Sequence, residues 1–180
     1  MILDAKTNCL VLVDLQARLA PAIDSIDRVV ANCTLLAKAA QELQIPVIAT
    51  EQNPAGLGAT LDSMKPFASA TVAKIHFDAS REKPFLQAIG ERRGVVIAGT
   101  EAHVCVLQTA LGLARLGHDV AVVADAVGSR HPDDRAAALS RVAANGLEIV
   151  TSEMVVFEWL GRSDRAAFKT LLPLVKDRMR

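Results

Sequence analysis

The segment from Val95 to Val106 (VVIAGTEAHVCV) most constrains what this chain can fold into. Its β-branched apolar run ends at Gly99, and a few small and polar residues follow. Cys105 then opens a long apolar run with helical spacing. This pattern predicts a buried strand, a tight turn and a buried helix with a cysteine near its first turn.

The position of Cys105 allows two interpretations. The free N–H groups and partial positive charge at a helix N-terminus lower the pKa of a thiol placed there. The same N–H groups could hold an oxyanion formed when the thiolate attacks a carbonyl. Alternatively, Cys105 is an inert small hydrophobe in the core. Local context alone leaves both interpretations open.

Apolar runs typical of buried strands alternate with segments of helical spacing along the chain. We expect strands at 8–14, 47–50, 71–75, 95–99, 120–125 and 147–151. We expect helices at 26–43, 81–89, 105–116, 131–146 and 152–159, and a further helix at the C-terminus. The alternation predicts a three-layer α/β/α fold with a doubly wound parallel sheet of about six strands.

Composition limits the domain number, the partners and the location. At 180 residues, a single domain spanning 1–180 is expected. A net charge of zero and 3% aromatic residues argue against nucleic-acid binding. Three cysteines without a CxxC pair favour neither a disulfide framework nor a thiolate zinc site. With no bilayer-length apolar run and no basic leader, we expect a cytoplasmic protein without a membrane partner.

Residues able to do chemistry lie where the expected strands end. They are Asp14, Thr50, Glu51, Lys74, the segment 99–105 and Asp125. The loop 51–58 follows a strand end, which is where open α/β sheets place ligand loops.

Taken together, these segments resemble the isochorismatase-like cysteine hydrolase family, which includes nicotinamidases and N-carbamoylsarcosine amidases. The resemblance covers nearly the whole chain. It rests on the motifs Val13–Gln16, Lys74–Phe77, Gly99–Val106, Asp125–Arg130 and Thr151–Glu153. The stretch from Thr50 to Gly58 is similar to a subgroup of uncharacterised isochorismatase-domain hydrolases.

The resemblance implies a sheet ordered 3-2-1-4-5-6 and a catalytic triad formed by Asp14, Lys74 and Cys105. Strands 1 and 4 then meet where the strand order reverses, so Asp14 and Cys105 flank one crevice. The resemblance also implies a cis peptide bond between Thr100 and Glu101. It implies an oxyanion hole made by the N–H groups of Glu101 and Cys105.

Several further residues are candidates for binding a small-molecule substrate: Gln16, Glu51, Phe77, Thr100 and His103. Glu51 could instead cap its loop, and His103 could be structural. Metal-dependent nicotinamidases carry histidines after the second strand, whereas this chain has Glu51–Gly56 there, without histidine. We therefore expect no catalytic metal and no cofactor.

Three functions remain open. The first is a metal-independent cysteine hydrolase that cleaves a C–N bond of a small carboxamide or ureido-type substrate through a thioester. The second is an isochorismatase-like vinyl-ether hydrolase, although relatives that act on isochorismate lack the cysteine. The third is a non-enzymatic scaffold, for which a complete triad has no physical use.

The segment Val104–Leu116 is apolar nearly all round. Such a helix must be covered on most sides. Part of the cover could come from a second subunit, so we expect a homo-oligomer, a dimer or a tetramer. The alternative is that helices of the same chain suffice.

Overall fold

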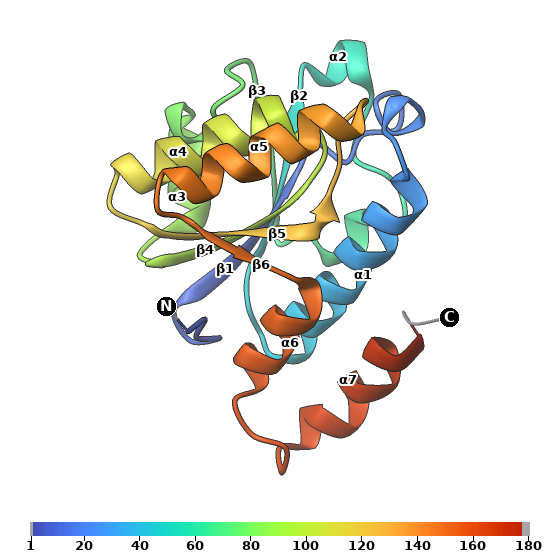
Figure 1. Cartoon of the computed structure of the whole chain (residues 1–180), viewed down its shortest axis with the longest axis vertical. Helices are drawn as coiled ribbons and strands as arrows, with labels where there is room; N and C mark the ends of the chain where they lie inside the picture. The colour runs from blue at the N-terminus through green and yellow to red at the C-terminus, as the bar shows by residue number, and fades with distance from the viewer. Residues whose placement is uncertain (1, 178–180) are drawn as a thin grey trace.

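The structure is a computed structural model that describes residues 2–177; Met1 and residues 178–180 of the expected domain lie outside this range. It contains one parallel sheet in the order β3-β2-β1-β4-β5-β6 (Figure 1). This confirms the predicted α/β fold and its strand order. The strands are β1 Asn8–Val13, β2 Val47–Gln52, β3 Ala70–Lys74, β4 Gly94–Gly99, β5 Asp119–Val127 and β6 Glu148–Val150.

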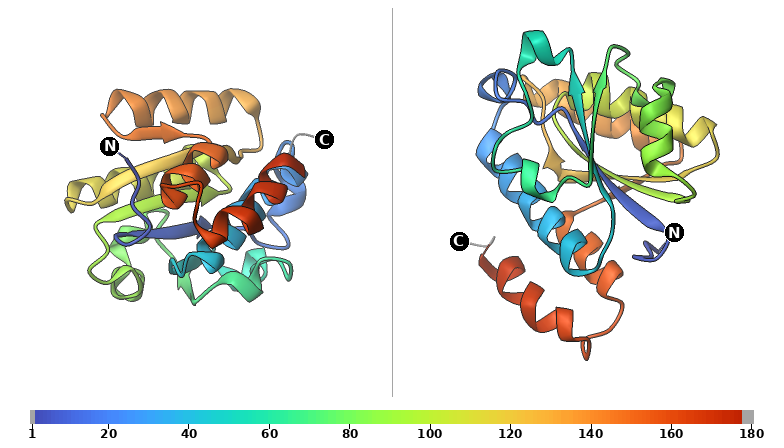
Figure 2. Two further views of the ribbon diagram at one scale, coloured as in Figure 1. Left: turned by 90° about the horizontal axis from the view of Figure 1, so that it is seen from below. Right: turned by 180° about the vertical axis from the view of Figure 1, so that it is seen from behind.

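Helices cover both faces of the sheet (Figure 2). The α-helices of the described residues are α1 Ile26–Glu42, α2 Pro54–Leu57, α3 Lys83–Ile89, α4 Leu107–Arg115, α5 Pro132–Ala144, α6 Ser152–Leu160 and α7 Ala166–Asp177. In the part of the chain that the structure describes, no helix has the length and apolar character needed to cross a membrane.

The β1 strand shows how the sequence builds these layers. Leu10 and Leu12 lie in the core beneath α1, α6 and α7, whereas Cys9, Val11 and Val13 lie in the core beneath α3, α4 and α5. Successive side chains of a strand point to opposite faces. A strand covered on both sides is therefore apolar at every position, as the run from Cys9 to Val13 is.

Two segments near the strand ends differ from the expectations. The β2 strand continues to Gln52 and is followed by the short helix α2, where a loop from Glu51 was expected. A π-helical turn, Ala102–Val106, precedes α4, where a helix beginning at Cys105 was expected. Such turns inside helices occur mostly at functional sites.

Gly99 allows the closest approach between the two central strands. Its φ is +127°, and an added Cβ would lie 2.1 Å from the carbonyl oxygen of Val13. Because β1 and β4 pair there, this approach sets the distance between Asp14 and the turn that carries Cys105.

We expect Gly99→Ala to lower the free energy of unfolding by about 3 kcal/mol, since the methyl group meets backbone atoms that cannot move aside. Gly117→Ala is the matched control, because Gly117 also has positive φ (+89°) but has no atom near the added Cβ. That control should cost about 1–2 kcal/mol. Urea denaturation measures both, and equal losses would show that the contact with Val13 is unimportant.

Candidate active site

Asp14 follows the last residue of β1 and is fully buried. Its φ of +50° turns the chain away from the sheet. Its Oδ1 accepts a hydrogen bond of 2.7 Å from the Thr50 hydroxyl, and its Oδ2 lies 2.9 Å from Lys74 Nζ. Oδ2 thus faces the ammonium group, while Oδ1 is held by the hydroxyl.

Lys74 reaches this carboxylate from the far side of β2. It ends β3, where it pairs in register with Gln52, and its side chain is fully removed from solvent. Nζ donates a hydrogen bond of 2.6 Å to Gln52 Oε1. The backbone oxygens of His76 and Phe77 lie farther away, at 3.4 and 3.5 Å. The long lysine side chain thus spans β2 and ends at β1.

Cys105 lies in the π-helical turn and is 3% exposed. Burial raises the pKa of the thiol to about 12, the charge of Asp14 adds to this effect, and Lys74 opposes it. The expectation that a helix N-terminus lowers the pKa of Cys105 is therefore wrong, because desolvation of the thiolate is the larger effect. At neutral pH the thiol of Cys105 is therefore protonated.

The turn after β4 ties the segment that carries Cys105 to Asp14. The Thr100 hydroxyl donates a hydrogen bond of 2.7 Å to the backbone oxygen of Asp14, and the Thr100 N–H donates to that of Val13. The expected cis bond between Thr100 and Glu101 is wrong, since the described residues contain no cis peptide bond. The chain turns instead through Glu101, which has a φ of +56°. The oxyanion hole formed by the N–H groups of Glu101 and Cys105 stays a prediction.

The side chains of Gln16 and Glu51, two candidate substrate-binding residues, form hydrogen bonds within the protein. Gln16 donates from Nε2 to the backbone oxygens of Gln52 and Gly58, and its Oε1 accepts from the Gln52 N–H at 2.8 Å. Glu51 Oε1 accepts 2.7 Å hydrogen bonds from both the N–H and the hydroxyl of Thr60. Both residues fasten the segment after β2 and thereby shape the site.

Phe77 and His103 are two further candidates for binding a substrate. Phe77 is 52% exposed, and its backbone oxygen faces Lys74. His103 lies 3.0 Å from the Ser129 hydroxyl, and its other ring nitrogen is 3.8 Å from Glu101 and 3.7 Å from Asp134. These contacts, together with an ion pair between Arg130 and Glu101, hold the side chain of Glu101 in the turn after β4.

Gln52 was not predicted as a site residue, and it was expected to lie in a loop. The structure places its amide oxygen 2.6 Å from Lys74 Nζ and 4.0 Å from Cys105 Sγ. Its place in the motif after the second strand was a signal, but nothing in the sequence showed that β2 continues to this residue. No group of three or more His, Cys, Asp and Glu suited to a metal ion occurs within residues 2–177.

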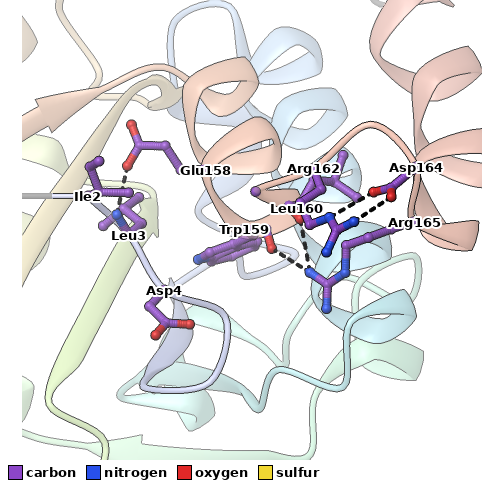
Figure 3. Close-up of a pocket in the computed structure, with 10 residues that line it drawn as sticks. Ile2, Leu3, Asp4, Glu158, Trp159, Leu160, Arg162, Asp164 and Arg165 are labelled. Atoms are coloured by element: carbon purple, nitrogen blue, oxygen red, sulfur yellow. Dashed lines mark hydrogen bonds and ion pairs between the residues drawn. The ribbon is translucent and has the colours of Figure 1, made fainter.

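A cavity of about 780 Å³ lies away from this site, between the segment before β1 and the end of α6 (Figure 3). Several of its polar groups form hydrogen bonds within the lining. Glu158 accepts from the Leu3 N–H, and Arg165 donates to the backbone oxygens of Trp159 and Leu160. It contains none of the triad residues.

Comparisons with known proteins concern the family and the fold of this chain. Residues 8–154 match the Isochorismatase domain. Isochorismatase domain-containing protein 2 of Xenopus laevis is 34% identical, over 97% of this chain and 86% of its own length.

Solved structures with more than 25% sequence identity share the fold, and three of them illustrate the likeness. The MAR1 ribonuclease from Caenorhabditis elegans superposes with a TM-score of 0.93 at 33% identity, covering 98% of this chain and 93% of its own. YcaC from Escherichia coli, described as an octameric hydrolase of unknown specificity, has a TM-score of 0.91 at 26% identity, covering 99% and 93%. YcaC from Pseudomonas aeruginosa, solved with hexane-2,5-diol and covalent acrylamide, has a TM-score of 0.89 at 27% identity, covering 96% and 90%.

We expect iodoacetamide to label Cys105 before Cys9 and Cys33, which are completely buried. Because only the thiolate reacts and the pKa is about 12, the rate should rise about tenfold per pH unit from pH 7 to 10. Peptide mass mapping gives the rate at each cysteine, and Cys105→Ser provides the background. A rate that levels off near pH 7 would mean that the thiolate is already formed at rest.

Proposed function

The chain belongs to the isochorismatase family, and we propose that it is a metal-independent cysteine hydrolase acting on a C–N bond of a small carboxamide or ureido-type substrate. One observation carries this proposal: a buried ion pair of 2.9 Å, Asp14–Lys74, lies beside the buried thiol of Cys105. Burying two charges costs several kcal/mol per ion before their attraction is counted. A base and a cation next to a nucleophile give that arrangement a chemical purpose.

The reaction begins with proton transfer. Asp14 Oδ2 takes the proton from Cys105, and the sulfur attacks the carbonyl carbon of the substrate. The N–H groups of Glu101 and Cys105 hold the resulting oxyanion. Collapse of this intermediate breaks the C–N bond, and Asp14 returns its proton to the leaving nitrogen.

Hydrolysis of the thioester uses the same groups. Asp14 removes a proton from water, the hydroxide adds to the thioester carbonyl, and the C–S bond breaks. The acid product leaves, and the sulfur regains its proton from Asp14. Lys74 stabilises the sulfur anion in both halves of the reaction, since its charge lowers the pKa of the thiol.

A screen of small amides, ureido compounds and vinyl ethers tests this proposal, with RNA added because the nematode relative is named a ribonuclease. Acid quenching during turnover should trap an acyl group on Cys105, visible as added intact mass. Cleavage of a vinyl ether or of RNA without such an adduct would reject the proposed reaction.

We expect Asp14→Asn to reduce turnover about 10²–10⁴-fold, because an amide can neither accept the thiol proton nor return it to the leaving group. The variant also leaves Lys74 buried without its counter-charge, at a cost of about 3–5 kcal/mol in stability. Circular dichroism at the assay temperature therefore accompanies the kinetics. Asp62→Asn is the control, since the Asp62 side chain is 95% exposed, and near-normal turnover by folded Asp14→Asn would exclude Asp14 as the base.

We also propose that the protein is a homo-oligomer, as the Escherichia coli relative is described to be. The helix that suggested this is partly covered by its own chain: Ala110 and Leu113 are fully buried, whereas Leu116 is 57% exposed. Closed symmetric assemblies are the usual form. We expect light scattering behind a sizing column to give a multiple of 19.2 kDa at micromolar concentration. A monomer mass throughout that range would contradict the proposal.

A further inference from the structure

Gln52 has a main chain that is fixed independently of its side chain. Its N–H donates to Gln16 Oε1 at 2.8 Å, and its backbone oxygen accepts from Gln16 Nε2 at 3.1 Å. It also pairs with Lys74 in the sheet. A substitution at position 52 therefore keeps these backbone contacts and changes only what the side chain does.

The side chain of Gln52 points its amide oxygen toward Lys74 and Cys105. Oε1 accepts from Lys74 Nζ at 2.6 Å and lies 4.0 Å from Cys105 Sγ. Nε2 donates to the backbone oxygen of Ile75 at 2.8 Å, and this bond fixes which end of the amide faces the lysine. The orientation of the amide thus follows from two hydrogen bonds that agree with each other.

The ammonium group of Lys74 can donate three hydrogen bonds. Its two short contacts are Asp14 Oδ2 at 2.9 Å and Gln52 Oε1 at 2.6 Å. The remaining acceptors, the backbone oxygens of His76 and Phe77, are at 3.4 Å or more. Without Gln52, attraction to Asp14 would dominate, and the ammonium would move toward the carboxylate.

We propose that Gln52 is a positioning residue whose neutral amide oxygen holds the Lys74 ammonium where it reaches both Asp14 and the sulfur of Cys105. The neutrality of the acceptor matters. A carboxylate in the same place would hold the lysine equally well but would cancel the charge that stabilises the thiolate. This inference rests on the proposed Asp14–Lys74–Cys105 chemistry.

The test compares Gln52→Met with Gln41→Met, a matched change at an exposed position of α1. Methionine keeps the length of the side chain and removes the acceptor. The readout is the rate of Cys105 alkylation by iodoacetamide between pH 7 and 10, which needs no substrate. We expect Gln52→Met to react about three- to tenfold more slowly at each pH, and Gln41→Met to match wild type. An unchanged or faster rate for folded Gln52→Met overturns the proposal.

Gln52→Glu tests whether the neutrality of the acceptor matters. This variant keeps the reach and the acceptor for Lys74 but loses the Nε2 donor to Ile75 and adds a charge near the sulfur, so we expect slower alkylation. Alkylation at the wild-type rate would show that the neutrality of the acceptor is unimportant. A double-mutant cycle with Lys74→Met completes the test: Gln52→Met should have no further effect once the lysine is gone. An equal effect in both backgrounds would show that Gln52 does not act through Lys74.

The two proposals can fail separately. If no amide is hydrolysed but Gln52→Met still slows alkylation through Lys74, the positioning role stands and the proposed reaction falls. If amides are hydrolysed and Gln52→Met keeps the wild-type kcat and alkylation profile, the reaction stands and the positioning role falls.

Discussion

The ion pair between Asp14 Oδ2 and Lys74 Nζ joins the ends of β1 and β3 across the intervening strand β2, out of contact with water. The structure offsets its desolvation with hydrogen bonds from neutral groups: Thr50 donates to the carboxylate, and Gln52 accepts from the ammonium. Both neutral partners belong to β2, the strand that the pair crosses. Removing either charge would leave the other buried alone, which is the costly outcome for a buried pair.

The sheet supplies the geometry that this pair needs. Reversal of the strand order brings the ends of β1 and β4 together, and Gly99 lets their backbones approach more closely than any side chain would permit. The Thr100 hydroxyl then ties the turn after β4 to the backbone of Asp14. Asp14 and the turn that carries Cys105 are thus fixed to each other by backbone contacts, and Lys74 reaches them from β3 by the length of its side chain.

Much of this arrangement could be predicted from the sequence, because it depends on local patterns. Runs such as Val95–Gly99 are apolar at every position only when both faces are covered, so the strands and the strand-end positions of Asp14 and Lys74 were readable. The extension of β2 to Gln52 was not, since it depends on pairing with Lys74 of β3 and on hydrogen bonds with Gln16, both far away in the chain. The raised pKa of Cys105 was also hidden, because it depends on tertiary burial rather than on its position near a helix.

The raised pKa of the Cys105 thiol means that this thiol is protonated at rest. In the proposed reaction, Thr50 keeps its hydrogen bond to Oδ1 of Asp14, and Oδ2 exchanges a proton with the sulfur. Moving that proton from the sulfur to the carboxylate produces a thiolate and a neutral acid, so the net charge of the site does not change. A buried site can tolerate such a step, because the total charge held away from water stays the same throughout.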